Sequence, residues 1–183
     1  MKTAVLSSCA AAVLATGAWA EGSLQGIPVT LQVLTYDTPD ELLFATDIVG
    51  ATVTDEQEFR IGPGAEDFKL DVVPIALDIS DSKVEIIYIV PSPGELYKAR
   101  FNGYVLTFDS ACPALLSARV DRAGTDLGLS SKRVRAEGNR LMINVSDMTY
   151  MPNGRIAVDL EVADCAAPVA PINTLSSGKK SSG

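Results

Sequence analysis

The sequence predicts an all-β protein, an antiparallel β-sandwich of about eight or nine strands and of jelly-roll or immunoglobulin-like type. Three observations lead to this prediction. Short apolar runs recur between turn-forming residues, and several of these runs alternate apolar with polar residues at a period of two. No window of helical length after residue 20 shows the apolar spacing of an amphipathic helix. A partly closed barrel is the alternative arrangement of the same strands.

The first predicted strand is GIPVTLQVLTY at 26–36, whose odd-numbered residues from Ile27 to Val33 are apolar and share one face. Thr-Pro-Asp at 38–40 ends this strand, because proline lacks the backbone N–H that a sheet needs. Further strands are expected within the segments 41–54, 56–64, 68–80 and 83–90, which turn residues separate.

The segment ELYKARFNGYVLTF at 95–108 reads as one long strand with a bulge at Gly103. Tyr104, Leu106 and Phe108 share one face of it, and the other face is also apolar. A strand that is apolar on both faces is typical of the centre of a sheet. We therefore interpret these aromatic residues as core and not as an exposed recognition surface.

Three strands are expected in the last third of the domain, besides a short one at 115–120. Gly138-Asn139 separates 133–137 from 140–148, and two residues of this type predict a tight hairpin. The last strand, 155–162, alternates most regularly, with Ile156 and every second residue after it facing the core.

The first twenty residues, MKTAVLSSCAAAVLATGAWA, have the features of a secretory signal peptide. Lys2 precedes an apolar stretch that ends in the small-x-small pattern Ala18-Trp19-Ala20. We expect cleavage after Ala20, a secreted or periplasmic protein, and no transmembrane segment in the mature chain. The alternative is a lipoprotein signal, LSSC at 6–9, with Cys9 acylated.

Residues 21–165 are expected to form one β domain, and the Ala/Pro-rich and then Ser/Gly/Lys-rich end at 166–183 a flexible tail. The chain is acidic, with a net charge of -8. Residues 21–97 contain three basic and fifteen acidic residues, whereas 98–183 contain eleven basic and eight acidic. This balance argues against nucleic acid as a partner, because phosphate binding needs a basic surface. The acidic half could attract cations or basic partners, or serve solubility alone.

Loss of the signal peptide would leave two cysteines, Cys112 and Cys165. An even pair in an exported chain predicts a disulfide bond, which would hold the last strand beside residue 112. Two free thiols or a pair of metal-binding cysteines are the alternatives. A loop of this length would contribute on the order of 4 kcal/mol in the chain-entropy description of disulfides.

The sequence has no histidine. Catalysis by Ser-His-Asp or Cys-His groups and histidine-containing zinc or copper sites are therefore excluded. The glycine-rich phosphate-binding motifs and the G-x-S-x-G and S-x-x-K motifs are also missing. We expect a non-enzymatic protein. A hydrolase of envelope polymers that uses two carboxylates is the remaining enzymatic alternative.

Clustered carboxylates are the candidates for a metal site, since calcium takes oxygen ligands. The candidates singled out are Asp55, Glu56, Glu58, Asp78 and Asp81, with further acidic clusters at Asp37, Asp40 and Glu41 and at 66–67. Their spacing matches neither the EF-hand loop nor the calcium-binding nonapeptide repeat. Solvated loops and turn caps explain them equally well, so no cofactor is expected and calcium is the one alternative.

The ordered series VVPIALDISDSKVEIIYIV, FNGYVLTFDSACPALLSARVDR and RLMINVSDM, followed by RIAVDLEV, resembles a secreted sandwich region of bacterial exported proteins of the PEP-CTERM sorting type. The resemblance spans about residues 44–163. It implies the domain type and no catalytic residues. Those proteins end in a Pro-Glu-Pro motif, a transmembrane helix and basic residues, whereas this chain ends in Ser, Gly and Lys.

The sequence thus favours an exported β-sandwich with a surface, matrix or partner-binding role, its partner a protein or an envelope polymer. A periplasmic domain that binds calcium or a small ligand is the alternative. Any binding surface is expected in the acidic loops before residue 97.

Overall fold

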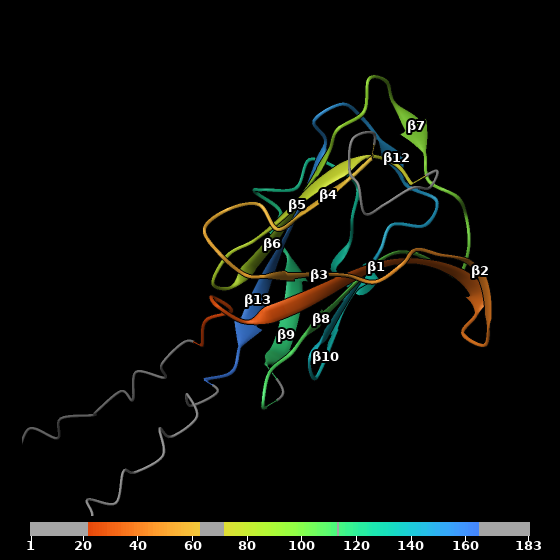
Figure 1. Ribbon diagram of the computed structural model, residues 1–183. Coiled ribbons are helices and arrows are strands. Elements are labelled where there is room, and N and C mark those ends of the chain that lie inside the picture. The colour runs from red at the N-terminus through yellow and green to blue at the C-terminus, as the bar shows by residue number, and fades with distance from the viewer. Residues whose placement is uncertain (1–21, 63–71, 113, 165–183) are drawn as a thin grey trace, which may run out of the picture.

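The computed structural model describes residues 22–62, 72–112 and 114–164, and it confirms an all-β protein with antiparallel sheets (Figure 1). The elements are β1 (Pro28–Thr38), β2 (Glu41–Ala45), β3 (Val49–Thr52), β4 (Phe59–Ile61), β5 (Ile75–Ile79), β6 (Lys83–Tyr88), β7 (Gly94–Glu95), β8 (Phe101–Phe108), β9 (Leu115–Val120), the 3-10 turn η1 (Ser131–Arg133), β10 (Val134–Glu137), β11 (Arg140–Asn144), β12 (Thr149–Tyr150) and β13 (Arg155–Val162). None of the described residues belongs to a helix that is long and apolar enough to cross a bilayer. The predicted signal peptide and tail lie outside the described residues.

The thirteen strands in the described ranges exceed the eight or nine expected. The segment 41–54 forms two strands, β2 and β3, because residues 46–48 separate them. Strands β7 and β12 have two residues each, which is too short for an alternating pattern to show in a sequence.

The larger sheet has the order β10-β11-β8-β1-β2, and β3 also pairs with β1. Strand β8 pairs with β1 without interruption, from Val29 opposite Phe108 to Tyr36 opposite Phe101. Strands β2 and β3 pair with different parts of β1, β3 near its start and β2 near its end. Because β8 occupies the other side of β1, β2 and β3 together form one edge of this sheet.

The second sheet has the order β4-β5-β6-β13-β9, and β7 pairs separately with β12. Strand β13 confirms the prediction for 155–162, since the alternate residues from Ile156 onward are buried. Its register with β9 shifts between Glu161 and Val162. Buried side chains of both larger sheets belong to a single hydrophobic core. A lone bridge between Leu115 and Gly138 joins the β9 edge of one sheet to the β10 edge of the other.

The prediction of a central, buried strand at 101–108 is confirmed, because β8 lies between β11 and β1 and seven of its eight residues are buried. The prediction of one strand over 95–108 with a bulge at Gly103 is wrong. Strand β7 ends at Glu95, β8 begins at Phe101, and the register of β8 runs regularly through Gly103 on both sides. Gly103 is needed for another reason: a Cβ atom there would lie 1.9 Å from the carbonyl oxygen of Ile143.

The predicted hairpin at Gly138-Asn139 is confirmed. Strands β10 and β11 pair with Glu137 opposite Arg140, and Gly138 has a φ of 60°. A positive φ at the first position of a two-residue loop is typical of a hairpin turn and favours glycine.

Candidate functional site: a cavity beside the β2 edge

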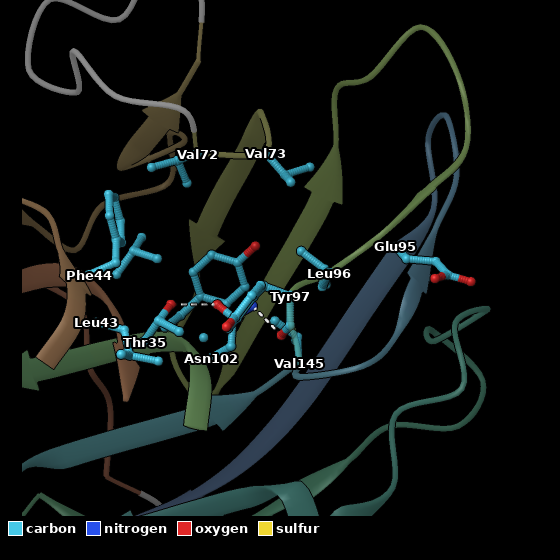
Figure 2. Close-up of a pocket in the computed structure, with 13 residues that line it drawn as sticks. Thr35, Leu43, Phe44, Val72, Val73, Glu95, Leu96, Tyr97, Asn102 and Val145 are labelled. Atoms are coloured by element: carbon cyan, nitrogen blue, oxygen red, sulfur yellow. Dashed lines mark hydrogen bonds between the residues drawn. The ribbon is translucent and has the colours of Figure 1, made fainter. Parts of the chain in front are cut away.

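A cavity of about 580 Å³ opens beside the β2 edge of the larger sheet (Figure 2). It is lined by Val33, Thr35, Leu43, Phe44, Val72, Val73, Glu95, Leu96, Tyr97, Asn102, Gly103, Tyr104 and Val145. Nine of these thirteen residues are Val, Leu, Phe or Tyr, including Tyr104 at the base of the cavity, and a tenth is glycine. The lining therefore combines an apolar surface with a few polar groups, as ligand-binding cavities generally do.

Two directly opposed pairs of residues on β1 and β8 form the floor of the cavity. Val33 lies opposite Tyr104, and Thr35 lies opposite Asn102. Opposed residues of an antiparallel pair share a face, and so do residues two apart along a strand. The regular register of β1 and β8 therefore brings all four side chains to the same side of the sheet.

The polar pair of the floor is fixed by hydrogen bonds. The hydroxyl of Thr35 donates to Asn102 Oδ1 at 3.0 Å, and Asn102 Nδ2 donates to the Tyr97 carbonyl oxygen at 2.8 Å. Both side chains are buried. An amide group carries two donor hydrogens. One hydrogen of the Asn102 amide is thus left without a partner among the described residues, at the floor of the cavity.

Strand β2 supplies the wall nearest the edge, through Leu43 and Phe44 (Figure 2). Thr46 holds the end of this strand against β1. The backbone N–H of Val33 donates to Thr46 Oγ1 at 3.0 Å, and the Thr46 N–H donates to the Val33 carbonyl oxygen at 3.0 Å. These bonds fix the strand that carries Leu43 and Phe44.

The opposite wall is the connection from β7 to β8, which carries Leu96 and Tyr97. Ser146 fastens this connection: its hydroxyl accepts from the Ala99 N–H at 2.8 Å and donates to the Ala99 carbonyl oxygen at 2.7 Å. The Leu96 N–H donates to the Met148 carbonyl oxygen at 2.9 Å. The wall is therefore held by the segment that follows β11.

Tyr104, which lines the base of the cavity, and its neighbour Tyr88 are poor acid-base groups. The Tyr104 hydroxyl lies 3.4 Å from that of Tyr88, and both side chains are buried. Burial raises the pKa of Tyr88 to about 12, and burial together with the neighbouring Tyr88 raises the pKa of Tyr104 well above its usual value. Both phenols are neutral over the physiological pH range. Glu95 is the single carboxylate among the lining residues.

The candidate calcium ligand Glu58 has a structural position. Its two carboxylate oxygens accept hydrogen bonds from the backbone N–H groups of Thr54, at 2.8 Å, and of Ile79, at 2.7 Å. Burial raises the pKa of Glu58, while these two hydrogen bonds act in the opposite direction. Glu58 thus links the connection before β4 to the end of β5.

The charge of Asp78 also raises the pKa of Glu58, but the hydrogen bonds and strand contacts of the other candidate ligands are separate from those of Glu58. Asp81 Oδ1 accepts a 2.5 Å hydrogen bond from the Ser23 hydroxyl, Asp78 lies opposite Glu85 on the neighbouring strand, and Asp55 and Glu56 are exposed. Within the described ranges no three His, Cys, Asp or Glu side chains come together as a metal site would require. The pair at 66–67 lies outside those ranges. The structure therefore does not gather the predicted calcium ligands.

The predicted disulfide falls partly outside the described residues, since Cys165 is not among them. Its proposed partner, Cys112, follows β8 and is half-buried. The chain just before Cys165 runs beside β9: the Ala163 N–H donates to the Ala114 carbonyl oxygen at 2.8 Å, and Val162 lies opposite Leu115. The bond itself stays a prediction.

Sequence reasoning missed the cavity, although one signal was present. Asn102 lies two residues before Tyr104 and so on the same face of a strand predicted to be buried in the core. A polar amide on that face marks a place where the core needs a hydrogen-bonding partner. Leu43 and Tyr97 carried no such signal, because the two opposite walls to which they belong depend on the loop contacts of Thr46 and Ser146, respectively.

Comparisons of the chain with protein-family models, with curated proteins and with solved structures gave no match. The resemblance to the PEP-CTERM type therefore depends on the sequence pattern alone.

Proposed function

We propose that the chain is an exported, non-enzymatic binding domain that holds an apolar group in the cavity beside β2. The two larger sheets would form a β-sandwich of the kind expected from the sequence, with the bridge between β9 and β10 closing one side and the cavity on the other. Support for export comes from the signal-peptide pattern of residues 1–20.

The observation that carries this proposal is the cavity itself. Its volume of about 580 Å³ lies within the range of about 300–1,000 Å³ that is usual for small-molecule sites. Its walls are largely apolar, and Asn102 and Thr35 provide hydrogen-bonding groups at the floor. An apolar body with one hydrogen-bond acceptor is the chemistry that fits this lining.

The lining favours binding over catalysis. Glycoside hydrolysis uses two facing carboxylates, and Glu95 is the single carboxylate of the lining. The buried phenols of Tyr88 and Tyr104 have raised pKa values and so are poor bases near neutral pH. A surface, matrix or partner-binding role in the cell envelope agrees with this chemistry and with the sequence resemblance.

Binding of a neutral apolar fluorophore, phenylnaphthylamine, tests the proposal. We expect saturable binding to the wild-type protein and at least about tenfold weaker binding to Leu43→Glu, a loss of about 1.4 kcal/mol. Leu43 is 52% exposed, so a carboxylate there reaches water without unfolding the strand. Leu116→Glu is the control, because Leu116 is 60% exposed on β9 in the other sheet. Equal affinity of the two variants would refute the cavity as the binding site.

A further inference from the structure

The β2 edge of the larger sheet is open in the described part of the chain. Strand β2 ends the strand order and pairs with β1 on one side only. In Figure 1 the β1–β2 hairpin extends away from the body of the domain. An edge strand presents unpaired backbone N–H and C=O groups, which another extended chain can pair with.

The side chains at this edge are apolar on both faces. Leu42 is 53% exposed and Leu43 is 52% exposed, and consecutive residues of a strand point to opposite faces. Ile48, just after β2, is 65% exposed. Leu43 also lines the cavity, so the edge and the cavity form one continuous surface. Neighbouring exposed apolar residues are typical of an interaction surface, whereas single exposed apolar residues are common on any protein.

The charge around the edge selects the partner. The exposed carboxylates of Asp40, Glu41 and Asp47 flank these apolar residues, and the sequence has no Lys or Arg between residues 22 and 59. Two copies paired through this edge would bring like charges together, which disfavours self-association. A basic partner would instead be attracted by these carboxylates.

We propose that an extended, basic peptide segment of a partner protein pairs with β2 and places one apolar side chain in the cavity. This inference rests on the proposed function and specifies the partner. Backbone pairing with β2 supplies affinity, the cavity selects the apolar side chain, and the carboxylates select flanking Lys or Arg residues.

The test uses a synthetic peptide that alternates lysine with leucine and valine, titrated into the full protein at physiological salt. Two control peptides accompany it: one has glutamate in place of lysine, and one has methyl groups on every backbone nitrogen, so that neither edge carries an N–H. We expect binding of the basic peptide only, with slowed hydrogen exchange at the amides of residues 41–45. Binding of the methylated peptide with equal affinity would overturn strand pairing, because that peptide cannot complete a ladder.

Two charge-reversal variants locate the surface. Asp40→Lys combined with Glu41→Lys should weaken peptide binding at least about tenfold. Asp55→Lys combined with Glu56→Lys is the matched control: it changes the net charge equally, but it lies after β3, which pairs with the opposite end of β1. Since charges separated by more than about 8 Å are largely screened at this salt concentration, the control should leave the affinity within about twofold. Equal effects of the two variants would overturn the inference.

Failure of this inference differs from failure of the proposed function. No peptide binding at millimolar concentration, with fluorophore binding intact and sensitive to Leu43→Glu, would refute the peptide partner and leave the cavity site standing. Peptide binding that Leu43→Glu does not weaken would refute the placement of a side chain in the cavity.

Discussion

The Thr35 hydroxyl on β1 donates a 3.0 Å hydrogen bond to the side-chain oxygen of Asn102, the directly opposed residue on β8. Both residues are buried at the floor of the cavity. This bond orients the Asn102 amide and lets a polar group lie inside an apolar enclosure without an unsatisfied acceptor.

Replacing the hydroxyl should therefore cost stability. Thr35→Val keeps the shape of the side chain and leaves Asn102 Oδ1 without its donor, which should lower the free energy of unfolding by about 1–3 kcal/mol. Urea denaturation measures the loss. Thr30→Val on the same strand, where Thr30 makes no side-chain hydrogen bond with the described residues, should change stability by less than about 0.5 kcal/mol. Similar losses in both variants would contradict a specific role of the bond.

Gly103 should tolerate no side chain. A Cβ atom there would lie 1.9 Å from the Ile143 carbonyl oxygen, and a backbone atom cannot move aside as a side chain can. Gly103→Ala should therefore destabilise the protein by about 1–3 kcal/mol or more, measured by thermal or urea unfolding. Gly128→Ala is the control, because a Cβ atom at Gly128 meets nothing within 4 Å. A neutral Gly103→Ala would mean that β8 and β11 are farther apart than described.

Asp78 should make stability depend on pH. Burial, and then the charge of the opposed Glu85, raise the pKa of Asp78 above its usual value. The pKa of Asp78 is higher in the folded than in the unfolded protein. The protonated Asp78 therefore contributes stability in acid, below the unfolded-state pKa, and this contribution is lost as pH rises through the folded-state pKa. Asp78→Asn removes this cost, so it should be more stable than wild type by up to about 1 kcal/mol near neutral pH.

The same comparison in acid provides the control. In acid, once Asp78 is protonated in both the folded and the unfolded protein, the stability difference between Asp78→Asn and the wild type should disappear. Denaturant unfolding at both pH values, with chelator present, measures it. A difference that is equal at the two pH values would show that the effect is not electrostatic.

The predicted link between Cys112 and Cys165 can be tested by mutation. Val162, three residues before Cys165 in the sequence, pairs with Leu115, three residues after Cys112. We expect Cys112→Ser to lower the free energy of unfolding by about 2–4 kcal/mol under oxidising conditions, and to have little effect in reductant. Two free thiols in the exported, oxidised protein would contradict the link.

The sequence predicted the strands whose pattern depends on burial alone. Strand β13 alternates because one face meets the core, and β8 carries apolar residues on both faces because both faces are covered. The hairpin at Gly138 was predictable because its backbone conformation restricts the residue type. Burial of a strand face and a restricted turn conformation both limit which residue types can occur, so both can be predicted from the sequence.

The cavity was not predictable in the same way. Its walls come from β2, from the β7–β8 connection and from residues near 72 and 145, which lie far apart in the sequence. Thr46 and Ser146 position these walls through hydrogen bonds to backbone groups of Val33 and Ala99, and any residue type offers such groups. Asn102 is the one lining residue whose place in an apolar strand hinted at the site.

The most direct test of the cavity as a binding site is methyl NMR during titration with phenylnaphthylamine. We expect saturable shifts, with intermolecular contacts to the probe, for the methyl groups of Val33, Leu43 and Val145, which line the cavity. Leu116 on β9, exposed to a similar extent, should not shift. Contacts at Leu116 as strong as those at Val33, or no contacts at the cavity methyl groups at saturation, would contradict binding in the cavity.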